Sequence, residues 1–179
     1  MSLANFDWTN LVPLASGLIG ALVGGGIGYF AQIRTLEADL SVRRKSLAHA
    51  LAAEIEAFEK IVNRRDIPRR CQAAADAARA GNENAVREWL SEQDGKLNIL
   101  PIYHANLGNI GLLGPACVEL VTFVGQVEAI LNTIRGVHEG IYDKLNSGLV
   151  ADLFEGELEL WRVSEKLAAK VIADLRAIT

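Results

Sequence analysis

The chain has 179 residues, half of them hydrophobic but only 6% aromatic, a length that allows one domain with an appendage. The apolar residues are mostly Ala, Leu, Val and Ile and do not gather into alternating runs, so we predict an all-α fold. The net charge of −4 gives no reason to expect nucleic acid as a partner.

The first predicted element is an uncharged segment from Trp8 to Ile33. Its 26 residues would form a helix of roughly 39 Å, more than the roughly 30 Å hydrocarbon core of a bilayer requires. Trp8 and Tyr29 lie near its two ends, where amphipathic rings suit the membrane interface. We therefore expect residues 1–10 to be a short extracytoplasmic tail and residues 11–33 to be a single transmembrane helix.

Two other interpretations of this segment are weaker. A cleaved signal peptide would need a basic n-region, but the first ten residues contain no Lys or Arg. A buried helix of a soluble protein would have to contain the six glycines between Ala15 and Phe30, at up to about 1 kcal/mol each relative to alanine. In lipid that cost matters less, because a backbone without water to bond must stay helical.

The small residues of this segment fall into two adjacent rows with a spacing of four. Such rows let two helix backbones approach closely and drive helix association in membranes, as in a glycine zipper. We predict that they form a helix-packing interface. The first row is Ser16, Gly20, Gly24 and Gly28, and the second is Gly17, Ala21 and Gly25.

Four basic residues follow the uncharged segment, whereas none precedes it. Cytoplasmic flanks of membrane helices are enriched in Lys and Arg, so we expect the N-terminus outside and the bulk of the chain in the cytoplasm. Three of the four either contact anionic lipid headgroups or form a solvated helix face, and the sequence leaves both interpretations open. The four basic residues are Arg34, Arg43, Arg44 and Lys45, and the last three are the candidates for contact with lipid headgroups.

An unbroken helical pattern over residues 34–67 predicts a helical stalk. Apolar residues recur there every eleven positions, a spacing typical of a straight or slightly right-handed coiled coil. The helix should end at Asp66-Ile67-Pro68, because the residue before a proline disfavours the helical conformation. The two apolar rows are Leu36, Leu47 and Phe58, and Leu40, Leu51 and Val62.

Residues 68–179 are predicted to form a small cytoplasmic α-helical bundle. Its first part has short elements punctuated by Gly, Asn and Pro. In chain order we expect two helices within residues 69–90 that break at Gly81-Asn82, a loop over residues 91–98, and a helix from Pro101 that stops at Gly111.

Two longer helices complete the bundle, one from Gly114-Pro115 to about Arg135 and one from about Leu149 to the end. The first is apolar enough for a second membrane span to be conceivable. Its carboxylates, Glu119 and Glu128, would each cost a few kcal/mol in lipid, so we predict a buried bundle helix. The expected apolar faces are Cys117, Val121, Val124, Val127, Leu131 and Ile134 on the first helix, and Val150, Phe154, Trp161, Ala168, Val171, Leu175 and Ile178 on the second.

Catalytic and metal-binding patterns are missing from the sequence. It contains no H-E-x-x-H, C-x-x-C, G-x-S-x-G or phosphate-loop motif, so we expect no enzyme, no cofactor and no metal. The two cysteines, Cys71 and Cys117, match no metal or redox spacing and are predicted to be reduced, buried thiols. His104 is the best single polar candidate, and we expect it to bond within the bundle.

The segment "IYHANLGNIGLLGPACVELVTFVGQVEAIL" resembles one found in small, uncharacterised bacterial single-pass membrane proteins with an α-helical cytoplasmic region. The matching residues are Tyr103, Asn106, Gly111, Leu112, Leu113 and Pro115, followed by the apolar helix. The resemblance implies an α-helical fold and a location in the bacterial inner membrane. It implies no catalytic residue.

These observations predict a non-enzymatic, membrane-anchored assembly protein. It would self-associate, or dock onto a larger membrane complex, through the glycine-rich face of its transmembrane helix. The alternative is a homo-oligomeric membrane pore, because helices with Gly and Ala faces also pack tightly around a channel axis. Ion flux through reconstituted liposomes would separate the two.

The charge asymmetry around the uncharged segment makes the topology testable. A reporter fused after Thr179 should be active in the cytoplasm, and the N-terminal tail should be accessible from outside. Replacing Arg34, Arg43, Arg44 and Lys45 by glutamine should weaken this bias. A C-terminal reporter that is active only on the outer side would reverse the assignment.

Overall fold

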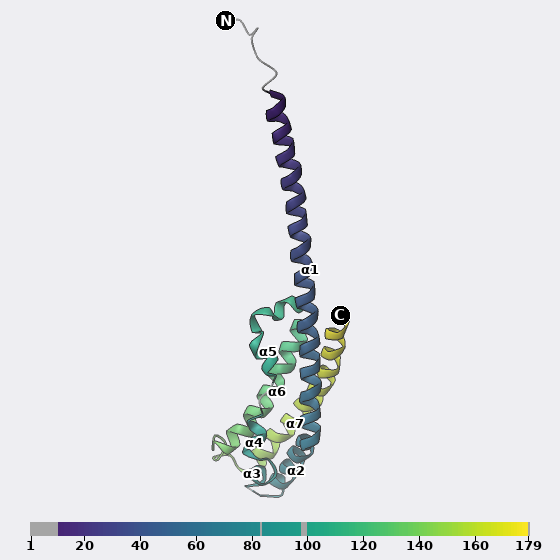
Figure 1. Cartoon of the computed structure of the whole chain (residues 1–179). Coiled ribbons are helices and arrows are strands. Elements are labelled where there is room, and N and C mark those ends of the chain that lie inside the picture. Colours follow the sequence, from purple (N-terminus) through teal and green to yellow (C-terminus); the bar gives the residue numbers. More distant parts are fainter. Residues whose placement is uncertain (1–10, 83, 98–99, 179) are drawn as a thin grey trace. The chain divides into compact units, whose positions relative to one another are not determined.

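The computed structural model describes residues 11–82, 84–97 and 100–178, with the side chains of residues 11–27 outside the description. Every regular element in these residues is helical (Figure 1), which confirms the all-α prediction. The elements are α1 (Leu11–Arg65), α2 (Ile67–Arg79), α3 (Ala85–Trp89), α4 (Glu92–Gly95), α5 (Pro101–Ala105), the 3₁₀ helix η2 (Leu107–Leu113), α6 (Ala116–His138) and α7 (Ser147–Ala177).

The chain divides into two compact units, Met1–Arg43 and Arg44–Thr179. The predicted boundary between stalk and bundle at residues 67 and 68 therefore falls inside the second unit. The reason is an apolar stripe on the C-terminal part of α1 that is buried in the core of that unit. The stripe is Leu47, Leu51, Ile55, Phe58 and Val62.

Two predicted helix boundaries are confirmed. Helix α1 ends at Arg65, and Asp66 adopts a left-handed conformation with φ 52° that turns the chain into α2. Pro68 lies in the first turn of α2, where its missing N–H leaves no bond unmade. The break predicted at Gly81-Asn82 separates α2 from α3, and Gly81 has φ 95°, a conformation that favours glycine.

The loop predicted over residues 91–98 is wrong in its first part, where the four-residue helix α4 forms. A capping box explains the difference. Ser91 precedes the first residue of α4, and its side chain is paired with the backbone of Asp94, the third residue of the helix. In return, the Asp94 carboxylate accepts hydrogen bonds from the backbone N–H and the hydroxyl of Ser91, each 2.8 Å long. The helix predicted from Pro101 also differs, because α5 ends at Ala105 and the chain continues as η2.

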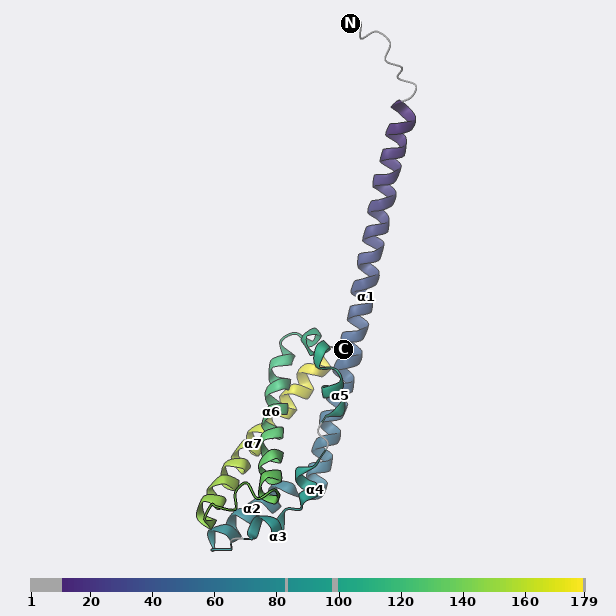
Figure 2. The ribbon, with the colours of Figure 1, turned by 90° about the vertical axis from the view of Figure 1, so that its left-hand side faces the viewer.

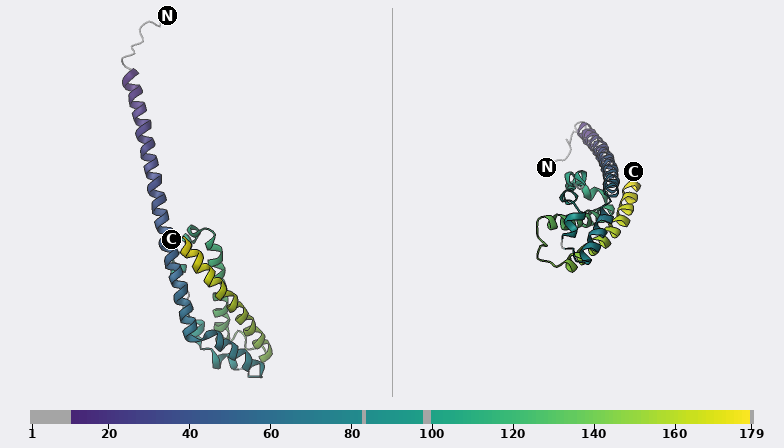
Figure 3. Two further views of the ribbon diagram at one scale, coloured as in Figure 1. Left: turned by 90° about the vertical axis from the view of Figure 1, so that its right-hand side faces the viewer. Right: turned by 90° about the horizontal axis from the view of Figure 1, so that it is seen from below.

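Helices α6 and α7 lie side by side in the second unit (Figures 2 and 3) and pack against each other. The predicted apolar stripe of α7 is largely confirmed, with Phe154, Trp161, Val171 and Leu175 buried. The stripe of α6 is rotated from the prediction. Val121 is exposed, and the core side of α6 instead includes Leu120, Phe123, Val124, Val127, Ile130, Leu131 and Ile134.

Among the residues whose side chains the structure describes, which leaves out residues 11–27, α6 alone is long and apolar enough to cross a membrane, by length and composition. Many of its apolar side chains are buried in the protein core, as expected for a bundle helix. Its two carboxylates also have protein partners, since Glu119 pairs with Lys170 of α7 and Glu128 lies 3.3 Å from His104 of α5. The contacts therefore agree with a core helix.

Burial of Trp161 gives a direct test of the core. Its indole is 7% exposed and its ring centroid lies 6.4 Å from that of Phe58. Replacing Trp161 by alanine should lower the free energy of unfolding by about 3–5 kcal/mol, because the cavity cannot close fully. Chemical denaturation followed by circular dichroism would measure the change.

Trp89 supplies the matched control, because its side chain is 45% exposed. Trp89→Ala removes the same indole from a surface position and should change the free energy of unfolding by less than about 1 kcal/mol. Equal losses for the two variants would contradict the placement of Trp161 in the core.

Candidate functional site

The predicted glycine interface lies mostly outside the described side chains. Helix α1 begins at Leu11 and continues through all six glycines of the run, but Ser16, Gly17, Gly20, Ala21, Gly24 and Gly25 carry no side-chain description. Gly28 is the one member that is described, and a Cβ atom built there would meet nothing within 4 Å. The interface therefore stays a prediction.

Large apolar side chains are exposed on the described part of the first unit. Tyr29, Phe30, Leu36, Leu40 and Val42 all have more than a third of their surface accessible. Leu36 and Leu40 stand eleven residues before Leu47 and Leu51, which are buried in the second unit. The same apolar rows are thus exposed in one unit and enclosed in the other.

The basic cluster predicted to meet lipid is exposed at all three of its positions. Within the first unit, Nε of Arg43 lies 2.9 Å from the Asp39 carboxylate. Within the second unit, Arg44 lines a surface depression with Leu113 and Pro115. Its Nη2 atom lies 3.6 Å from the position that a Cβ would take at Gly114. Lys45 follows directly on α1.

His104 has the role expected of it. Its Nε2 atom lies 3.3 Å from Oε1 of Glu128, and both side chains are more than 40% exposed, so the pair bridges α5 and α6 at the surface. The described residues contain no group of three or more His, Cys, Asp or Glu side chains that could hold a metal ion.

The cysteines differ in environment. Burial and, to a smaller extent, the nearby Glu157 carboxylate raise the pKa of the Cys71 thiol to about 12. Cys117 is only partly buried, so the prediction of two buried thiols holds for Cys71 alone. A thiol with a raised pKa is a poor nucleophile at neutral pH.

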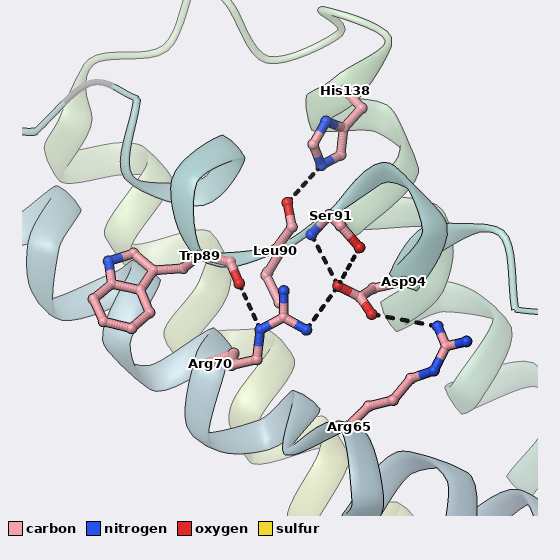
Figure 4. A network of polar contacts seen from close by, with 7 residues as sticks. All are labelled: Arg65, Arg70, Trp89, Leu90, Ser91, Asp94 and His138. Carbon is pink, nitrogen blue, oxygen red and sulfur yellow. Dashed lines mark hydrogen bonds and ion pairs between the residues drawn. The ribbon is translucent and has the colours of Figure 1, made fainter.

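Asp94 (Figure 4) is the one charged side chain that is buried among the described residues of the second unit, and it is 2% exposed. Its carboxylate accepts the two bonds from Ser91 and lies 3.0 Å from Nη1 of Arg70 and 3.5 Å from Nη1 of Arg65. Nε of Arg70 also donates to the Trp89 carbonyl at 2.7 Å. The ends of α1, α2, α3 and α4 are therefore tied together by one carboxylate.

A second set of contacts attaches this cluster to α6. Nε2 of His138 lies 2.8 Å from the Leu90 carbonyl oxygen (Figure 4), and Nη2 of Arg135 donates to the Gly95 carbonyl at 2.9 Å. Gly95 permits this approach, because a Cβ atom there would lie 2.9 Å from the backbone nitrogen of Arg135. Apart from the two Ser91–Asp94 bonds, which cap α4, the contacts of the cluster join one helix or its flanking residue to another, so their role is structural.

Sequence reasoning missed a third feature, the N-terminal cap of α5. The Glu54 carboxylate of α1 accepts hydrogen bonds from the backbone N–H groups of Ile102 at 2.5 Å and Tyr103 at 3.0 Å. Those N–H groups have no partner inside the helix, and a carboxylate near them is favoured by the helix dipole. The capping residue is 48 positions away from Ile102 in the sequence, so no local pattern could reveal it.

An open apolar groove lies beside this cap. Three small residues of α1 line it together with the start of α5, and little polar surface interrupts it. The small residues are Ala50, Ala53 and Ala57, and Ile61, Leu100 and Ile102 complete the walls.

Comparisons of the chain with protein-family models, with curated proteins and with solved structures found no match. The interpretation of these surfaces therefore rests on the residues themselves.

The buried carboxylate predicts a large stability effect from a small change. Asp94→Asn keeps the shape of the side chain but removes the charge that faces Arg65 and Arg70. The free energy of unfolding should fall by about 2–3 kcal/mol, because hydrogen bonds to a charged group are lost in a site closed to water. Asp66→Asn is the control, since that side chain is 54% exposed in its pair with Arg69 and should change stability by less than about 1 kcal/mol. Equal melting curves for Asp94→Asn and the unmodified chain would refute the role of this cluster.

Proposed function

We propose that the chain is a non-enzymatic, single-pass assembly protein of a bacterial inner membrane. Residues 11–33 would span the bilayer, and the second unit would carry the helical bundle in the cytoplasm. The glycine-rich face would either join copies of the chain or dock the chain onto a larger membrane complex.

The observation that carries the proposal is the uncharged run from Trp8 to Ile33. Helix α1 covers it from Leu11 onward and is not interrupted at any of the six glycines. In water a helix with this many glycines needs packing partners, whereas in lipid the helix is the only way to satisfy the backbone. Membrane insertion accounts for both the composition and the helix.

Two further observations support the anchor and its orientation. Tyr29 and Phe30 are exposed near the cytoplasmic end of the run, where aromatic rings are favoured at the membrane interface. The four basic residues that follow favour a cytoplasmic position for the second unit. The resemblance of residues 102–131 to bacterial membrane proteins supports the choice of membrane.

The assembly role is supported by the spacing of small residues. Rows of Gly, Ser and Ala with a spacing of four let helices approach closely in lipid. The groove lined by Ala50, Ala53 and Ala57 offers the second unit a surface of similar character. No described side chain favours the pore alternative over assembly.

Gly24 lies at the centre of the proposed span and makes the interface testable. Gly24→Leu should dissociate the oligomer or complex, because a gap of 0.5–1 Å already forfeits about a quarter to a half of the contact attraction, and a branched side chain opens a wider one. Insertion should be unaffected, since leucine is more apolar than glycine. Crosslinking in native membranes and the mass of the detergent-solubilised particle would report the result.

Leu22→Ile is the matched control, because it changes an apolar side chain outside the two small rows and should leave the complex unchanged. An intact complex with Gly24→Leu, combined with a dissociated one for Leu22→Ile, would remove the support for the glycine interface.

A further inference from the structure

We propose that the end of the second unit formed by η2 and the first turns of α6 contacts the surface of an anionic bilayer. This inference rests on the proposed membrane anchor and adds a peripheral contact to it. The contact would involve the exposed side chains of Leu107, Val118 and Val121.

The three side chains are apolar and exposed. Leu107 is 55% exposed, Val118 is 69% exposed and Val121 is 45% exposed. Exposed apolar side chains that cluster on one part of a surface mark sites of contact with proteins or membranes. Leu107 lies on η2, which packs against α6, and Val118 and Val121 lie three residues apart on α6, a spacing that places them on the same side of that helix.

The sequence before Val118 is uncharged, and Glu119, which lies between Val118 and Val121, is paired with Lys170 of α7. From Leu97 to Val118 the sequence contains no Asp, Glu, Lys or Arg. The opposite end of α6 differs. Ile141 is 64% exposed there, but Glu139, Asp143 and Lys144 surround it in the sequence. An apolar surface whose neighbouring carboxylate is already paired with a lysine enters the headgroup region at a lower desolvation cost than one flanked by several charged residues.

Basic residues lie at the same end of the second unit. Arg44 borders η2 and the start of α6, as its distance of 3.6 Å from the Cβ position at Gly114 shows, and Lys45 follows it. The nearest acidic residue on α6, Glu119, is bonded to Lys170, which lowers the pKa of its carboxyl. Arg44 lines the same depression as Glu119 and Asp174, and among the described residues neither Arg44 nor Lys45 forms an ion pair, so both cations can meet the negative surface of the cytoplasmic leaflet.

A short stretch of chain connects the proposed anchor to the start of the second unit. Only ten residues separate Ile33, the last residue of the uncharged run, from Arg44, the first residue of the second unit. A chain segment of this length spans at most about 40 Å even when it is fully extended. The anchor therefore keeps this end of the unit within reach of the lipid, while a free domain would have to bind from solution.

The test uses the full chain reconstituted in vesicles of phosphatidylcholine and phosphatidylglycerol. Cys117→Ser provides the background, because the remaining Cys71 is buried and its thiol does not react. Val118→Cys and, separately, Ile141→Cys are labelled with an environment-sensitive fluorophore. Both residues are β-branched, apolar and similarly exposed, but Val118 lies in the first turn of α6 and Ile141 lies three residues after the end of α6.

Lipids that carry a nitroxide quencher should quench the label at position 118 several-fold more than the label at position 141. Equal quenching at the two positions would overturn the proposal. The double variant Arg44→Glu, Lys45→Glu should reduce quenching at position 118, because the attraction to anionic lipid is lost. Vesicles of phosphatidylcholine alone should have the same effect. Quenching at position 118 that neither change affects would overturn the choice of an anionic surface.

An alkaline carbonate wash separates this inference from the proposed function. A chain that resists the wash but shows equal quenching has the anchor and lacks the peripheral contact. A chain that the wash removes lacks the anchor, and the proposed function then fails irrespective of the quenching result.

Discussion

The second unit depends on the burial of one apolar stripe, the side of α1 that runs from Leu47 to Val62. Phe58 lies at its centre, and its ring meets Phe123 of α6 and Trp161 of α7 with centroids 6.5 and 6.4 Å apart. A helix cannot leave such a stripe in water, because each large apolar side chain contributes about 1.5–3 kcal/mol on burial. The longest helices, α1, α6 and α7, therefore share one core, and the short helices occupy the space that remains.

Those short helices need polar contacts, because helices of four or five residues are not stable by themselves. The structure supplies partners from distant parts of the chain. Asp94 joins α4 to Arg65 and Arg70, and Glu54 caps α5 from α1. The buried Asp94 is satisfied on both oxygens, which is the condition under which a buried charge stabilises a fold. Polar chemistry in the described residues is thus largely devoted to holding helices together.

The sequence predicted the long elements well and the connections between them poorly. Periodicity identified α7 and the end of α1, because each places a continuous apolar side against the core. Periodicity predicted a buried face of α6 that is rotated from the observed one. Val121 and Leu120 are both apolar, and only packing decides which of them faces inward. The capping box of Ser91 and Asp94 is a local signal that could have revealed α4. The cap from Glu54 and the contact of His138 with Leu90 join residues about fifty positions apart, so no local pattern contains them.

Charge distribution links the fold to the proposed orientation at the membrane. Residues 34–70 carry a net charge of +3, and residues 71–179 carry −6. An anionic bilayer would attract the part of the chain that follows the uncharged run and repel the rest, within a screening distance of about 8–10 Å. The uncharged stretch from Leu97 to Val118 escapes that repulsion, because it contains no carboxylate. Five of the nine cations in residues 34–70 follow Ala57, and Arg65 and Arg70 among them lie in the Asp94 cluster that His138 at the end of α6 joins. The uncharged surface around Leu107 and Val118, and not the net charge, therefore distinguishes the end that we propose to meet the lipid.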